Sequence, residues 1–240
     1  TVTMDGTGSI SGTSASLIFN NLLVNGLTTS VVSAARSFST AALFQVQQGT
    51  LTTSGLAAPI VMTALAGHSV GNGAGAAGTA QLALLGPATL AVSPGFAFTV
   101  NVVDGRFRAD IEAAAVPTLT RSGGTGAFDA VVSGQIDVRR LKFSFGDLEG
   151  LEIAPTATVT NLRGVAFSGP NSTPNARFLT VRSAGLSLDC PGCTFVALPV
   201  GTFNVWAQDT ASGDANRVRV RLENRGVAPL TGGGGDGAGE

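Results

Sequence analysis

The sequence predicts an all-β protein, in the first place an antiparallel β-sandwich of the jelly-roll kind with extended terminal segments. Short stretches in which apolar and polar residues alternate recur along the chain, and glycine, proline and asparagine separate them. Helical periodicity is poor, so we expect at most a turn or two of helix, near residues 58–66. A parallel β-helix is the alternative, although the absence of a fixed repeat period counts against it.

The first third of the chain predicts short strands and one exposed loop. Residues 1–55 are rich in Ser, Thr, Val and Ala and are divided by glycines. Residues 67–78, with the sequence GHSVGNGAGAAG, carry too little side-chain volume to pack a core and are expected to form a loop. Within residues 80–93, three leucines precede Gly86-Pro87, which indicates a strand followed by a turn.

Residues 96–112 predict a β-hairpin. Asp104-Gly105 is a pair typical of a type I′ turn, and apolar residues alternate with other residues on both sides of it. A two-residue turn would pair Val102 with Phe107, which would place the apolar residues of both strands on one face. We therefore expect one buried and one solvated side.

Further strands are expected at short intervals up to the C-terminal region. They cover residues 127–132, 135–145, 157–161, 177–182, 195–198, 203–208 and 217–223. We expect a single β-rich domain over residues 1–230, and a division into two sub-lobes near residues 67–78 stays open. Residues 231–240 have the composition of a flexible glycine-rich tail.

Charged side chains are distributed very unevenly. The chain has 14 Lys and Arg and 15 Asp and Glu, yet only Asp5 and Arg36 lie within residues 1–103. Because about a quarter of the residues of a soluble domain are usually charged, this stretch is expected to turn much of its surface toward other protein molecules. The net charge of −1 gives no indication of nucleic-acid binding.

This pattern favours a structural subunit of an extracellular, self-assembling polymer, such as a pilus-like filament, a sheath or a surface layer. Copies would associate through charge-poor β surfaces, and residues 1–13 are a candidate donor strand for a neighbouring copy. Two other classes stay open: a virion tail, fibre or decoration protein, and a secreted module that binds carbohydrate or a surface through Trp206. We expect neither enzymatic activity nor a cofactor.

The segment Cys190-Pro191-Gly192-Cys193 is the most specific local motif. Proline followed by glycine is typical of a type II turn, which brings the two cysteines within disulfide reach. We expect a structural disulfide, with metal-binding thiols or a redox pair as alternatives. A stable disulfide indicates an extracellular or cell-surface location after removal of an export signal.

No apolar run is long enough for a membrane-spanning helix.

Other candidate residues carry weaker signals. His68, the only histidine, is expected to be a solvated loop residue, and Asp147, Glu149 and Glu152 are carboxylates of the kind that glycosidases use. The glycines of residues 123–126 indicate a turn and not a phosphate loop. The remaining candidates are a calcium site at Asp209, Asp214 and Asn216, N-glycosylation at Asn171, and a small basic group of Arg139, Arg140 and Lys142.

Overall fold

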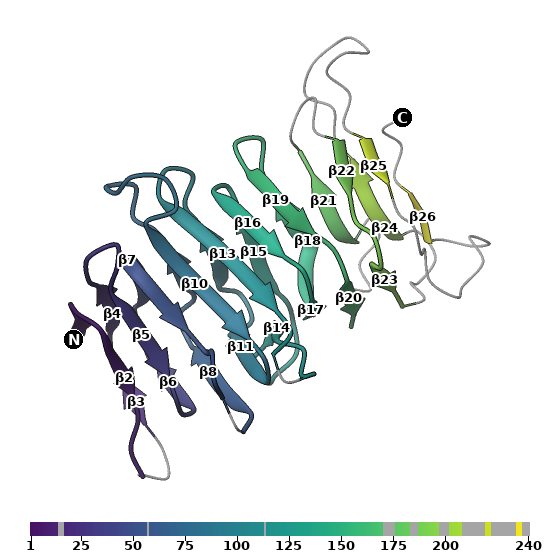
Figure 1. The fold of residues 1–240 in the computed structure, drawn as a ribbon. Helices are drawn as coiled ribbons and strands as arrows, with labels where there is room; N and C mark the ends of the chain where they lie inside the picture. The colour runs from purple at the N-terminus through teal and green to yellow at the C-terminus, as the bar shows by residue number, and fades with distance from the viewer. Residues whose placement is uncertain are drawn as a thin grey trace.

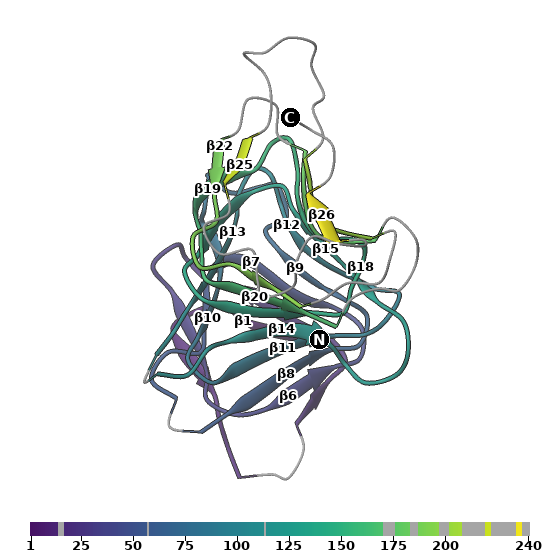
Figure 2. The ribbon, with the colours of Figure 1, turned by 90° about the vertical axis from the view of Figure 1, so that its right-hand side faces the viewer.

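The strands stack in parallel, and the chain winds as a β-solenoid in which successive coils add along one axis (Figure 1). The structure, a computed structural model, describes residues 1–13, 17–56, 58–112, 114–169, 176–182, 187–196, 202–207, 219–221 and 234–236. Three faces, here called A, B and C, surround a common interior, and the view turned by 90° shows the strands of each face stacked one behind another (Figure 2).

Each face takes one strand or part of a strand from most coils. Face A contains β1 (Val2–Met4), β4 (Leu22–Asn25), β7 (Phe44–Thr52), β9 (His68–Val70), β12 (Ala97–Val100), β15 (Phe128–Val132), β18 (Gly146–Ile153), β21 (Arg177–Val181), β24 (Thr202–Ala207) and β26 (Gly234–Asp236). Face B contains β2 (Gly8–Ile10), β5 (Val31–Ala34), the second half of β7, β10 (Ala80–Leu85), β13 (Gly105–Asp110), β16 (Gln135–Val138) and β19 (Thr158–Leu162). Face C contains β3 (Ile18–Phe19), β6 (Phe38–Thr40), β8 (Ile60–Ala64), β11 (Ala88–Val92), β14 (Thr118–Arg121), β17 (Leu141–Ser144), β20 (Val165–Ser168) and β23 (Thr194–Phe195). A separate two-stranded sheet pairs β22 (Ser187–Asp189) with β25 (Arg219–Arg221).

The core consists of like side chains stacked in register from coil to coil. One row on face A is almost entirely β-branched and reads Val24, Val46, Val70, Val100, Val132, Ile153, Val181 and then Ala207. A second row, on face C, reads Phe38, Met62, Leu90, Leu119, Phe143, Phe167 and Phe195. Paired strands lie about 4.7–4.9 Å apart, so each side chain rests directly on the next, and these rows belong to one continuous buried cluster.

The antiparallel sandwich is a wrong prediction, whereas the all-β class and the β-helix alternative agree with the structure. Every strand ladder among the described residues is parallel, and antiparallel pairing there is limited to an isolated bridge between Glu112 and Ala115. A fixed period is absent because coil length varies: Phe128 pairs with Gly146, 18 positions later, and Ala97 pairs with Asp129, 32 positions later.

The predicted hairpin at residues 96–112 is also wrong, and only part of its expected apolar face points inward. Phe98, Val100, Phe107 and Ala109 are buried, whereas Phe96, Val102 and Ile111 are 46%, 49% and 46% exposed. Phe98 and Phe107 are fully buried, and their ring centroids lie 5.1 Å apart. Their strands, β12 and β13, belong to faces A and B and pair with strands of the preceding and following coils. Alternation therefore identified the inward side chains in the middle of each strand, but neither the strand ends nor the neighbouring strands.

Two other expected elements differ from the structure. The segment expected to hold a turn or two of helix contains β8, whose inward residues Ile60, Met62 and Ala64 are buried. The single strand expected over residues 135–145 is divided into β16 and β17, which meet at a corner formed by Arg139 and Arg140. Residues 1–13, the candidate donor strand, contribute β1 and β2 to the chain's own faces, where they pair with β4 and β5.

Asp104 organises the glycine-rich loop that follows β9. Its carboxylate is completely buried and accepts hydrogen bonds from the backbone N–H groups of Asn72, Gly73 and Gly75 at 3.0–3.2 Å. Gly71 has φ +88°, and a Cβ there would lie 2.2 Å from an Asp104 carboxylate oxygen, so the approach requires glycine. Asp104, which was expected in the turn of a hairpin, instead accepts hydrogen bonds from the backbone N–H groups of a loop one coil away.

We expect Asp104→Ala to lower the free energy of unfolding by about 2–4 kcal/mol, because buried N–H groups lose a charged acceptor. Urea denaturation followed by circular dichroism measures the change. Asp5→Ala, which removes an exposed carboxylate, is the control and should change stability little. Equal stability of the two variants would contradict the role assigned to Asp104.

Candidate functional site

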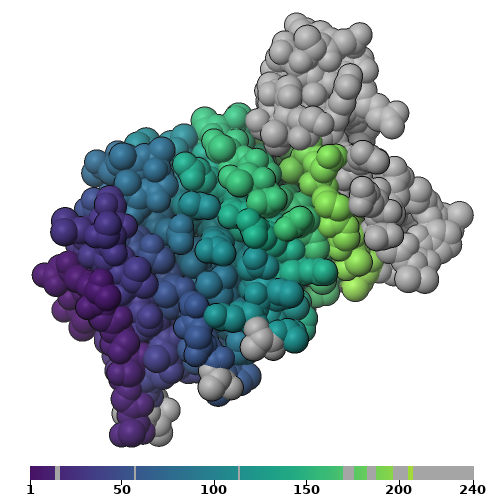
Figure 3. Space-filling model, viewed as in Figure 1, coloured from purple at the N-terminus to yellow at the C-terminus, as the bar shows by residue number. Residues whose placement is uncertain are grey.

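The charge-poor coils carry a row of exposed apolar side chains, here called the apolar ridge, formed by Leu43, Leu65 and Phe96. These residues are 41%, 42% and 46% exposed. Each lies in the turn from a face C strand to the next face A strand, in three successive coils: β6–β7, β8–β9 and β11–β12. The purple-to-blue coils that contain the ridge follow one another along the N-terminal half of the molecule (Figure 3).

The same turn in a later coil is covered by a charged group. Phe145 lies between β17 and β18, and the Arg121 guanidinium lies 4.0 Å from the centroid of its ring. This cation–π contact screens an aromatic ring that would otherwise resemble the ridge residues. The same turn thus carries a covered aromatic side chain in the later coil and exposed apolar side chains in the earlier coils. The apolar ridge belongs to the half of the solenoid that has almost no charge.

Next to the ridge, the outer surface of face C carries mostly small side chains. An outward row runs in register through Ser39, Thr63, Ala91 and Thr120, and it continues through Ser144 and Ser168. Ala91 and Ser144 are buried, and the other members of the row are half-buried. The hydroxyl groups of Thr120 and Ser144 lie 2.8 Å apart and share a hydrogen bond. Small side chains on a regular sheet allow another backbone surface to approach closely.

Three carboxylates gather on face A in the later, charge-rich coils. Asp147 and Glu149 lie in a bulge of β18, where the register shifts opposite Asp129 of β15. Glu152, farther along β18, binds the guanidinium of Arg182 at 2.9 Å, and Glu149 lies 3.8 Å from the same guanidinium. The structure therefore brings the expected carboxylates together and adds Asp129, which precedes Asp147 by 18 residues, or one coil.

The environment of Asp147 favours its protonated form. Burial, and after it the neighbouring charges of Asp129 and Glu149, raise the pKa of Asp147 to about 7, against the hydrogen bonds that it accepts from backbone N–H groups. Burial also raises the pKa of Asp129. A carboxyl whose pKa lies near 7 is able to accept or release a proton near neutral pH, and this is the chemistry that Asp147 makes available.

His68 is not the solvated loop residue that we expected. It is 3% exposed and occupies a core row between Phe44 and Phe98, with ring centroids 4.0 and 5.9 Å away. Nδ1 lies 3.0 Å from the Phe44 carbonyl oxygen, which assigns the proton to Nδ1. Burial lowers the pKa of His68 to about 3, against this hydrogen bond. The imidazole is thus a neutral core residue.

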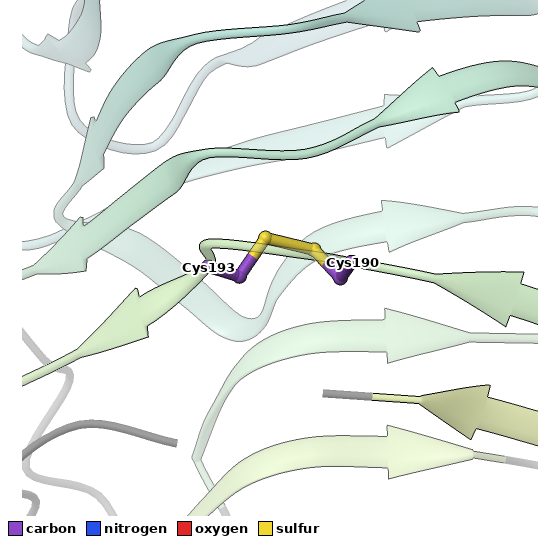
Figure 4. The surroundings of a disulfide bond; sticks show 2 residues. All are labelled: Cys190 and Cys193. Carbon is purple, nitrogen blue, oxygen red and sulfur yellow. A yellow bond between two sulfur atoms is a disulfide. The ribbon is translucent and has the colours of Figure 1, made fainter. Parts of the chain in front are cut away.

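The two cysteines lie at disulfide distance, with the sulfur atoms 2.06 Å apart (Figure 4). The Cys193 N–H donates to the Cys190 carbonyl oxygen at 3.2 Å, and Gly192 has φ +70°, as a type II turn requires. Both cysteines are fully buried. A disulfide of this kind fits a secreted or extracellular protein.

The structure separates the small basic group expected from the sequence. Lys142 points outward from face C, whereas Arg139 and Arg140 form the corner between faces B and C. Arg163, one coil later, joins this corner and was not expected from the sequence.

Trp206 lies on β24, and the Arg177 guanidinium lies 4.5 Å from the centroid of its ring.

The calcium candidates Asp209, Asp214 and Asn216, the sequon at Asn171 and most of the tail 231–240 lie outside the described residues. Within the described ranges, no group of three or more His, Cys, Asp or Glu side chains is arranged to hold a metal ion. The same ranges contain no helix that is long and apolar enough to cross a membrane.

Comparisons with protein families, with curated proteins and with solved structures return no match for this chain.

The pKa of His68 predicts a stability change in acid. Because its folded-state pKa of about 3 lies below the ordinary histidine value of 6.5, the unfolded chain binds a proton first as the pH falls from 6.5 to 3. We expect His68 to lower the free energy of unfolding by at most about 1.4 kcal/mol per pH unit there. Replacing it in His68→Leu should flatten the acid limb of stability measured by urea denaturation. An unchanged slope would contradict the burial of a neutral imidazole.

Asp147 predicts the opposite slope. Its folded-state pKa of about 7 lies above the ordinary aspartate value of 3.8, so the stability from its bound proton is present in acid and is lost as the pH rises from about 4 through 7. We expect Asp147→Asn to be more stable than the wild type at pH values above 7, with the difference shrinking toward pH 4. Thermal unfolding across this pH range measures it. Glu112→Gln is the control, and a constant difference at every pH would rule out the proposed titration.

Proposed function

We propose that this protein is a structural subunit of an extracellular assembly, and that copies associate through the apolar ridge and the adjoining small-residue surface of face C. The observation that carries the proposal is the position of the ridge. Its three apolar side chains are each more than 40% exposed, and they lie in a stretch of the chain that has only two charged residues. Exposed apolar surface without charge is typical of contact surfaces between protein molecules.

Burying the apolar ridge in a contact between two copies would be favourable in free energy. Burial of apolar surface contributes about 25 cal/mol per Å², and no charged group of the ridge would have to lose its hydration. The regular outer row of face C extends the contact surface beyond the ridge, which a stable interface of about 800 Å² per partner requires. The disulfide fits an extracellular location for such an assembly.

The solenoid also suggests how an assembly would be organised. Stacked coils repeat the same outer geometry along one axis, so a partner copy aligned with that axis would meet similar side chains in successive charge-poor coils. A pilus-like filament, a sheath and a surface layer are all compatible with lateral contacts of this kind. A virion component and a secreted carbohydrate-binding module are the alternative functions, and the second of these predicts a monomer.

Substitutions on the ridge distinguish an assembly surface from the core. Leu51, in the same charge-poor stretch, is completely buried, so a charge there would disrupt folding and not contacts. The double variant Leu65→Asp/Phe96→Asp places charges on exposed positions. We expect the wild type to form concentration-dependent larger species in sedimentation velocity and ordered material in negative-stain microscopy, and the variant to lose both.

A matched control is Ile111→Asp, which charges an equally exposed apolar residue, 46% accessible, in the charge-rich half. We expect this control to assemble as the wild type does. The circular dichroism spectrum and the unfolding midpoint of each variant verify that it is folded. A wild type that stays monomeric at all concentrations, or a ridge variant that assembles normally, would refute the proposal.

A further inference from the structure

A depression of about 360 Å³ lies at the corner between faces B and C in the later coils. Arg139 and Arg140 reach it from the corner between β16 and β17, and Arg163 reaches it from the corner between β19 and β20. Asp110, Gly164 and Pro191 form other parts of its lining. Three guanidinium groups from two successive coils therefore border one hollow.

The charges of this depression are incompletely neutralised. Arg139 lies 3.9 Å from Asp110 and 3.6 Å from Asp137, and both of these ion pairs are long. Asp137 is also bound by Arg106 at 3.2 Å and by Asn161 at 2.8 Å. Among the described residues, Arg140 and Arg163 form no ion pair.

The lining itself has one carboxylate against three guanidinium groups, which leaves a net charge of +2. A second carboxylate, Asp189, lines a neighbouring depression that shares Arg163 and Pro191 with the first. The local excess of positive charge is therefore greatest at Arg140, because Arg139 lies near Asp110 and Asp137 and Arg163 borders the depression that Asp189 lines.

The walls of the depression are held by backbone contacts. The Gly164 N–H donates to the Pro191 carbonyl oxygen at 2.9 Å, which ties the turn closed by Cys190 and Cys193 to the corner that carries Arg163. A Cβ on Gly164 would lie 2.8 Å from Cδ of Arg140, so the absence of a side chain there lets Arg140 lie across the corner.

We propose that this depression binds a phosphate or sulfate group carried by a small molecule or a sugar. Guanidinium groups bind oxyanions with paired, charge-assisted hydrogen bonds. Three such groups arriving from two coils suit an anion with several oxygen atoms around one centre better than a carboxylate, which has two. The volume lies within the range of small-ligand pockets, so space is left for the group that carries the anion.

Isothermal titration calorimetry of the whole chain with inorganic phosphate, inorganic sulfate, glucose 6-phosphate and glucose 6-sulfate tests the proposal, with acetate as the carboxylate comparison. We expect saturable binding of at least one tetrahedral oxyanion that is stronger than binding of acetate and is weakened by added salt. The sugar esters report whether the attached ring adds affinity or the bare anion suffices.

Arg163→Gln is expected to weaken binding about tenfold or more, since it removes a charge-assisted hydrogen-bond donor. Lys142→Gln is the matched control, because it removes another exposed positive charge, from the nearby face C, and it should leave affinity within about twofold. Circular dichroism verifies folding of both variants. No saturable binding of any of the four probes, or equal losses in both variants, would overturn the site.

Discussion

The stacking of inward side chains in register is the constraint on which the rest of the molecule depends. Parallel strands pair along each face, so the side chain at a given position in one coil must fit directly against its counterpart in the next. The row from Val24 to Val181 meets this condition with β-branched residues, which suit strand geometry. His68 also meets this condition, because its ring lies between those of Phe44 and Phe98. Burial at this position favours the neutral form of the imidazole.

Since the core determines only the inward residues, the outward residues are free to differ along the axis. The early coils use this freedom to present small and apolar side chains almost without charge. The later coils carry most of the charge: carboxylates such as Asp129 and Asp147 gather on face A, while Arg139, Arg140 and Arg163 meet at the corner between faces B and C. One scaffold thereby offers a surface suited to association and, farther along, a corner suited to an anion.

The alternation of residues was enough to predict β structure and most inward side chains, including Phe98 and Phe107. It was not enough to predict their neighbours, because the partners of a solenoid strand lie one coil away and coil length is irregular. Asp104 was misread for the same reason: its hydrogen-bond partners are about 30 positions earlier in the chain. Asp129 and Arg163 were missed because the residues that lie near them in the fold, Asp147 and Arg139, are one coil away in the chain.

The variable coil length has a consequence for how such a protein can change. Residues added at a corner lengthen a coil without shifting the strands on either side, as the span of 18 to 32 positions between paired residues demonstrates. The bulge of β18 is an insertion within a strand, and the pairing resumes beyond it. The solenoid therefore tolerates insertions at its corners. New loops can arise there while the hydrophobic interior stays unaltered.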